Sequence, residues 1–160
     1  MIILGIDPGI ADTGWGVISN IKNSLKYINC GSIKTNAKEE LAYRLENLHK
    51  DLDDIIKEYK PDIVGVEQLF FCANVKTALI VGQARGVVLL TARQNELPII
   101  EFTPLQVKQA VSAYGAASKM QVQRMVKTIL NLKEIPKPDD AADALAVAIA
   151  GANFNCHRPL

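Results

Sequence analysis

Residues 62–67, with the sequence DIVGVE, form the most informative stretch of the chain. Ile, Val, Gly and Val follow one another without polar alternation, which is typical of a β-strand covered on both faces. Before this strand, residues 39–59 carry leucine and isoleucine at three- and four-residue intervals, so they predict an amphipathic helix. After it, residues 75–95 predict a longer helix. A buried strand between two helices indicates an α/β fold.

The rest of the chain supplies further strands and helices in a clear order. Strands are predicted over residues 2–7, 13–19, 25–35 and 98–102. Helices are predicted from Pro104, over 119–131 and over 139–150. Three initial strands followed by strand–helix alternation predict a five-stranded mixed sheet flanked by helices. We expect one domain over residues 1–151 and a carboxy-terminal tail over residues 152–160.

Composition excludes several classes of protein. The 160 residues are 49% hydrophobic and 22% charged, which suits a folded globule, and their net charge is +1. The three cysteines form no C-x-x-C pair, so neither a zinc knuckle nor a disulfide framework is indicated. No signal peptide is evident, and the longest uncharged stretch is too short to span a bilayer. We therefore expect a cytoplasmic protein with no membrane partner.

Charge is unevenly distributed along the chain. Residues 68–133 hold eight lysines and arginines against two acids, a net charge of +6 within a nearly neutral protein. Such a segment suits contact with a phosphate backbone. It equally suits a set of solvated helix faces balanced by the acidic helix over residues 39–59. Charge alone leaves both interpretations open.

Acidic residues at strand ends and on one helix face predict a cluster. Asp7 and Glu67 end two apolar strands, and if these strands are parallel neighbours their ends lie ~5 Å apart. Asp140 and Asp143 are three residues apart, so they share a helix face. Asp143 lies in an alanine-rich segment fit for burial, where an acid needs a partner. No base is close to it in sequence, which leaves a distant base or a cation.

Each acid also has a simpler interpretation. Asp7 in an Asp-Pro-Gly sequence is a common turn former. Asp139 or Asp140, following Pro138, could cap the last helix. Four acids together, however, repel one another unless they are protonated or bind metal. Oxygen ligands select Mg²⁺ or Mn²⁺, and two such ions ~4 Å apart activate water for phosphodiester cleavage. His49 and His157 are interpreted as surface residues.

Five motifs in chain order resemble the RuvC family of Holliday junction resolvases. They are GIDPG at 5–9, VEQLF at 66–70, GQARG at 82–86, QVK at 106–108 and DDAADALA at 139–146. The resemblance runs in this order from residue 2 to about residue 150 and so covers nearly the whole chain. The resemblance implies an RNase H-like fold and a homodimer that resolves four-way DNA junctions by paired symmetric nicks in recombination and repair. It also implies two Mg²⁺ ions per site, with Mn²⁺ as a substitute, and 5′-phosphate products.

The resemblance also assigns roles to residues. Asp7, Glu67, Asp140 and Asp143 match the metal-binding catalytic acids. Phe70 matches an aromatic residue that stacks on a nucleobase of the DNA. Lys108 and Lys119 match basic residues beside the active site. Asn74 and Arg85 lie in matching motifs. The helix over residues 75–95 matches the dimer contact of the family. Partner proteins implied by the family are the branch-migration proteins RuvA and RuvB. Asp139 is a local departure, because it places a second acid beside Asp140.

Three other functions remain to be weighed. An RNase H-like nuclease acting on RNA–DNA hybrids would use the same acids and basic segment. A non-catalytic DNA-binding module would leave the repulsion between four acids without a purpose. A phosphotransferase of the actin–hexokinase type has a similar Gly-Ile-Asp-x-Gly loop. That fold needs two such domains, however, and the chain supplies one.

Overall fold

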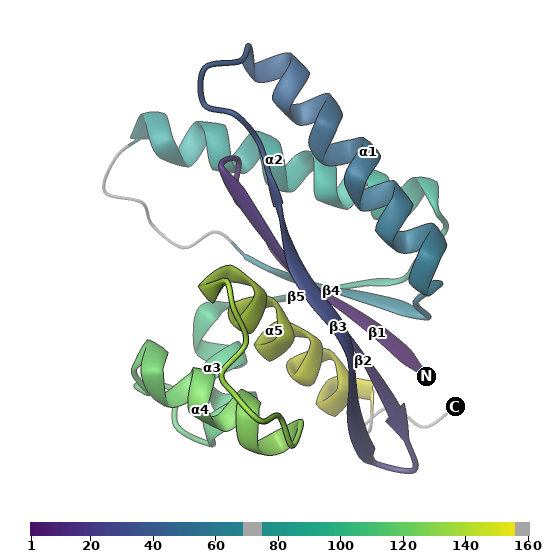
Figure 1. Cartoon of the computed structure of the whole chain (residues 1–160), viewed down its shortest axis with the longest axis vertical. Coiled ribbons are helices and arrows are strands. Elements are labelled where there is room, and N and C mark those ends of the chain that lie inside the picture. The colour runs from purple at the N-terminus through teal and green to yellow at the C-terminus, as the bar shows by residue number, and fades with distance from the viewer. Residues whose placement is uncertain (69–74, 156–160) are drawn as a thin grey trace.

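The computed structural model describes residues 1–68 and 75–155, and its centre is a five-stranded mixed sheet (Figure 1). The strands are β1 (Ile2–Asp7), β2 (Asp12–Ile21), β3 (Ser24–Lys34), β4 (Ile63–Glu67) and β5 (Ile99–Phe102). Their order across the sheet is β3-β2-β1-β4-β5. β1 pairs antiparallel with β2 and parallel with β4, and β4 pairs parallel with β5. The predicted mixed sheet is confirmed.

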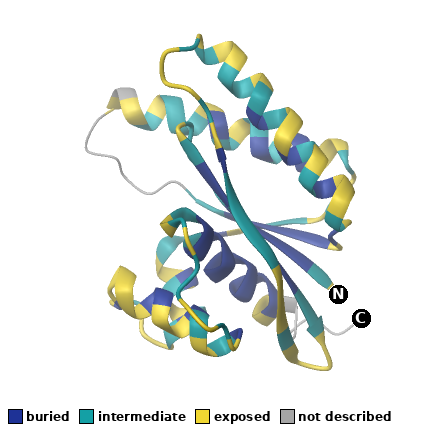
Figure 2. Cartoon of the chain, in the orientation of Figure 1, coloured by how far each residue is buried: buried dark blue, intermediate teal, exposed yellow. Residues whose placement is uncertain are grey.

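Helices cover both faces of the sheet (Figure 1). α1 (Leu41–Tyr59) and α2 (Val75–Gln94) lie on one face, and α3 (Pro104–Ser112), α4 (Lys119–Ile129) and α5 (Asp139–Asn155) lie on the other. Two buried apolar clusters correspond to these two layers. Figure 2 shows α5 as the most continuously buried helix, against the middle of the sheet. None of the helices in residues 1–68 and 75–155 is long and apolar enough to cross a membrane.

α5 contacts the sheet at backbone distance. A Cβ atom at Gly5 of β1 would collide with the carbonyl oxygen of Ala144, and one at Gly14 of β2 with the carbonyl oxygen of Asp140. Because glycine has no side chain, α5 lies closer to β1 and β2 than it could with any other residue at these two positions. The first turn of α5 therefore lies directly over the carboxy-terminal end of β1.

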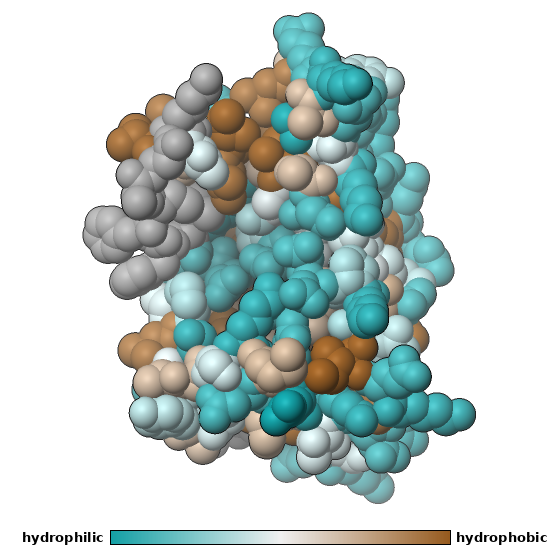
Figure 3. Space-filling model, turned by 60° about the vertical axis from the view of Figure 1, so that its left-hand side comes forward, coloured by the Kyte–Doolittle hydropathy of each residue, from teal (hydrophilic) through white to brown (hydrophobic). Residues whose placement is uncertain are grey.

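The outer face of α2 is apolar and exposed. Val75, Leu79 and Leu90 are 73%, 66% and 56% exposed, and a Cβ atom at Gly86 would meet nothing within 4 Å. The spacing of these residues puts them on one side of the helix. Figure 3 shows apolar side chains gathered in the upper left, over the amino-terminal part of α2. We call Val75, Leu79, Gly86 and Leu90 the α2 face.

Two boundaries differ from the sequence-based prediction. β2 and β3 are joined by a turn of two residues, Lys22 and Asn23, with φ of 50° and 64°, instead of a five-residue connection. Such a turn matches the twist of paired strands, and asparagine tolerates its left-handed conformation. α5 continues through Gly151 to Asn155, beyond the predicted start of the tail, and Ala152 is fully buried.

Candidate metal centre

Asp7 and Glu67 meet at one edge of the sheet, as predicted. They end the parallel neighbours β1 and β4, whose register pairs Ile6 with Val66. Side chains alternate along a strand. Because Gly5 and Gly65 face α5, the carboxyl groups of Asp7 and Glu67 lie on the α5 side of the sheet. The two carboxyl groups share a hydrogen bond.

α5 brings the other two predicted acids to the same place. Asp140 lies in its first turn and Asp143 one turn later. The charges of both raise the pKa of Asp7, so both are close enough to interact with it. Burial and the neighbouring charge of Asp12 in turn raise the pKa of Asp140. The structure therefore brings together all four acids, which come from three separate elements.

The two strand-end acids do not ionise like ordinary carboxyl groups. Burial, with the charge of Asp143 second, raises the pKa of Asp7 to about 6. Burial and the charge of Asp7 raise the pKa of Glu67 to about 8. The shared hydrogen bond lowers the pKa of Asp7 and raises that of Glu67, so Glu67 holds the proton. Near pH 7 this pair carries one proton and one negative charge.

Asp143 has a distant base as its partner in this structure. The Lys119 Nζ lies 2.9 Å from Asp143 Oδ2 and 3.7 Å from Asp139 Oδ2. Lys119 is the first residue of α4, where Ser118 and Gln121 form a capping box that fixes the helix start. The hydrogen bond to Asp143 raises the pKa of Lys119. The sequence left a distant base or a cation as the partner of Asp143. In this structure the partner is a base, Lys119, which binds Oδ2 of the carboxylate.

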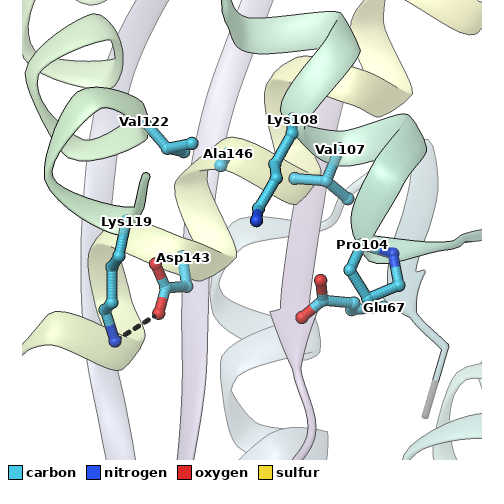
Figure 4. Close-up of a pocket in the computed structure, with 8 residues that line it drawn as sticks. All are labelled: Glu67, Pro104, Val107, Lys108, Lys119, Val122, Asp143 and Ala146. Carbon is cyan, nitrogen blue, oxygen red and sulfur yellow. Dashed lines mark ion pairs between the residues drawn. The ribbon is translucent and has the colours of Figure 1, made fainter. Parts of the chain in front are cut away.

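A cavity of about 180 Å³ opens beside the acids. Glu67, Asp143, Lys108 and Lys119 line it, together with apolar side chains of α3, α4 and α5. Figure 4 shows the Lys108 side chain pointing toward the space between Asp143 and Glu67, and its charge lowers the pKa of Glu67. Two lysines at the rim of an acidic site are suited to hold an anionic group next to a cation.

One predicted DNA-contacting residue, Arg85, is not brought to this site. Arg85 of α2 forms an ion pair with Glu101 of β5, and its Nε is buried without a hydrogen-bond partner within the described part of the chain. Phe70 and Asn74 lie outside the described residues. Sequence reasoning also omitted one acid that the structure places here, Asp12. The sequence alone gave no signal for it, because its place beside the site depends on the contact of Gly14, two residues later on the same face of β2, with Asp140.

The donor set fits a hard divalent cation, although no ligating geometry is preformed. Carboxylate oxygens are the ligands that Mg²⁺ and Mn²⁺ prefer. Within residues 1–68 and 75–155, no three Asp, Glu, His or Cys side chains are arranged to hold one ion. Two contacts explain why these acids are not arranged around one ion. Lys119 forms an ion pair with Asp143, and Asp7 and Glu67 share a proton. A cation would have to displace both of these positive charges in order to bind here.

Comparison with known proteins gives a consistent result. A family model for the crossover junction endodeoxyribonuclease RuvC matches residues 3–151. The protein of that name from Halothermothrix orenii is 57% identical over 153 residues, covering 96% of this chain and 93% of the relative. The structure of Thermus thermophilus RuvC superposes with a TM-score of 0.90 at 35% identity, covering 98% of this chain and 96% of that one.

A second structure shows a relative bound to DNA. T. thermophilus RuvC in complex with Holliday junction substrate has a TM-score of 0.89 at 34% identity, with 98% of this chain and 96% of that chain covered. The matched region includes the two strand ends and the helix that carry the four acids. This chain belongs to the RuvC family of crossover junction endodeoxyribonucleases.

Proposed function

We propose that this protein is a metal-dependent endonuclease that resolves four-way DNA junctions by paired, symmetric nicks. Membership of the family supports the activity. The observation that carries the proposal is the meeting of Asp7, Glu67, Asp140 and Asp143 at one edge of the sheet, beside Lys108 and Lys119. We further propose that residues 1–155 act as a single nuclease domain, since one sheet and the helices α3, α4 and α5 packed on one face of it carry all six of these residues.

The four acids would hold the catalytic cation, with Mg²⁺ as the natural ion, two ions per site, and Mn²⁺ as a substitute. Ions of this class activate water and stabilise the leaving oxygen during phosphodiester cleavage. Binding of the cation would release Lys119 from Asp143. The Lys119 amino group would then be free to bind a non-bridging phosphate oxygen. Lys108 approaches the same cavity from α3. The apolar side chains that line the cavity would lower the local dielectric constant and so strengthen these charge interactions.

Resolution of a four-way junction requires cuts in two strands, so the active assembly needs two catalytic sites. Each chain supplies one proposed site. The α2 face supports a homodimer because its apolar residues are exposed and share one side of the helix. Phe70, Asn74 and Arg85 remain proposed DNA contacts, by family resemblance alone. Association with the branch-migration proteins RuvA and RuvB is likewise proposed from the family.

A labelled synthetic four-way junction tests this function directly. The protein is incubated with the junction in Mg²⁺ and in chelator, beside an RNA–DNA hybrid of equal length. Paired, religatable nicks in the junction with Mg²⁺ alone are the expected result. Cleavage of the hybrid in preference to the junction would replace the proposed substrate. Junction binding without nicks at every metal concentration would indicate a DNA-binding module instead.

Binding of Mg²⁺ to the free protein should release about one proton at pH 7, because metal ligands must be deprotonated and Glu67 is protonated there. The proton competes with the cation, so affinity should rise from pH 6 toward pH 8. It should level off above the Glu67 pKa of about 8. Calorimetry in two buffers of different ionisation enthalpy measures the proton count. Glu67→Gln should abolish the release, and a wild-type protein that binds without releasing a proton would contradict the assignment.

A further inference from the structure

Asp12 is an acid next to the proposed metal centre to which neither the family motifs nor the residue pattern assigned a role. It is the first residue of β2, and Gly14, two residues later, lies under the first turn of α5. A Cβ atom at Gly14 would lie 3.0 Å from the Cβ of Asp140. Residues two apart on a strand share a face. Asp12 therefore points to the α5 side of the sheet, the side that carries Asp7, Glu67 and Asp140.

The carboxylate of Asp12 is incompletely satisfied. Its Oδ1 is buried and has no hydrogen-bond partner in the described part of the chain. Among the ion pairs of residues 1–68 and 75–155, none includes Asp12. A buried carboxylate oxygen without a partner costs free energy, and such groups are rare in folded proteins. An oxygen in this state next to a cluster of metal-binding acids indicates a partner that arrives with the metal.

Asp12 and Asp140 interact without a bridging base. Both are acids on the α5 side of the sheet, and no ion pair in the described part of the chain neutralises Asp12, so their like charges repel one another. This repulsion destabilises the metal-free protein. A divalent cation held by Asp140 would offset this repulsion, because it would bring positive charge close to both carboxylates.

We propose that Asp12 is a positioning residue of the metal centre, which accepts hydrogen bonds from the hydration shell of the cation next to Asp140. The inference rests on the proposed metal-dependent function. Mg²⁺ keeps several of its waters when proteins bind it, and outer acceptors orient that shell. Loss of such an outer partner in other metalloproteins weakens metal affinity by ~10- to 100-fold.

Metal affinity tests the proposal without using catalysis. Mn²⁺ binding is followed by electron paramagnetic resonance for the wild type, Asp12→Asn and Asp54→Asn. Asp54 is an exposed acid of α1 on the opposite face of the sheet, so Asp54→Asn removes the same charge elsewhere. We expect Asp12→Asn to weaken Mn²⁺ binding by ~10-fold or more, and Asp54→Asn to leave it within twofold of the wild type.

Thermal unfolding in chelator separates this role from a purely structural one. Asp12→Asn should unfold at the same temperature as the wild type or higher, because it removes repulsion from Asp140. If Asp12→Asn does not fold, Asp12→Ser carries the same test. Wild-type Mn²⁺ affinity in a folded Asp12 variant would overturn the inference and leave the proposed function intact. A wild-type protein that binds no Mn²⁺ would overturn the proposed function itself.

Discussion

Asp7→Asn is expected to abolish junction cleavage while junction binding stays the same or becomes tighter. Asp7 interacts with Glu67, Asp140 and Asp143 at once, so it is the acid that connects both halves of the proposed centre. The amide keeps the size of the side chain and removes its negative charge. Losing several kcal/mol of transition-state stabilisation from the metal corresponds to a rate loss of ~10³-fold. DNA binding does not suffer, since one charge that repels phosphate is gone.

Single-turnover cleavage with saturating protein measures this effect apart from binding, and a gel-shift assay in Ca²⁺ or chelator measures binding. Asp54→Asn is the matched control, with the same change of charge on the far face of the sheet. Asp7→Asn should also unfold at a higher temperature than the wild type in chelator at pH 8, because it removes a buried charge near Asp143. Undiminished cleavage by Asp7→Asn would show that the four acids are not the metal centre.

The second large effect is expected at Leu79, near the middle of the α2 face. Leu79→Arg should convert the proposed dimer to a monomer, because an unpaired charge at the centre of an apolar contact costs several kcal/mol. Each ~1.4 kcal/mol weakens association tenfold, so the dimer dissociation constant should rise by ~10²-fold or more. Arginine is chosen because it adds no repulsion toward DNA. Paired nicks within one junction should be lost, while single nicks persist.

Sedimentation at micromolar protein and a supercoiled cruciform plasmid provide the two measurements. Linear plasmid reports two nicks within one binding event, and nicked circles report one. Ile21→Arg is the control, because Ile21 is 55% exposed at the β2–β3 turn, away from α2. A Leu79→Arg protein that remains a dimer would place the contact elsewhere. A wild-type protein that is monomeric with junction bound would remove the dimer from the proposal.

Sequence reasoning predicted the contacts that follow from chain direction and side-chain period. Two apolar strands that each end in an acid, combined with parallel pairing, were enough to bring Asp7 and Glu67 together. The i, i+3 spacing was enough for Asp140 and Asp143. The Lys119–Asp143 ion pair could not be predicted this way, because it depends on how α4 packs against α5. The role of Asp12 was hidden for the same reason, since it depends on the contact of Gly14 with Asp140.

The end of the last helix was mispredicted for a different physical reason. Glycine after an apolar helical run usually marks a helix end. Gly151 instead lies inside α5, where a Cβ atom would come within 3.2 Å of Ile3 Cγ2 on β1. Close packing, and not the left-handed conformation of a helix end, explains this glycine. Local propensity could not distinguish the two uses, because they differ only in what lies opposite the residue.

The close contact between α5 and the sheet also bears on how this protein can change over evolutionary time. The spacing between acids on β1 and acids on α5 is set by backbone touching backbone, at Gly5 against Ala144 and at Gly14 against Asp140. Apolar side chains elsewhere in the two cores can therefore be exchanged without altering that spacing. Gly5 and Gly14 cannot be exchanged in this way, because a Cβ atom at either position would collide with the backbone of α5. In a saturation mutagenesis selected for junction resolution, Gly5 and Gly14 would tolerate as few replacements as the acids themselves.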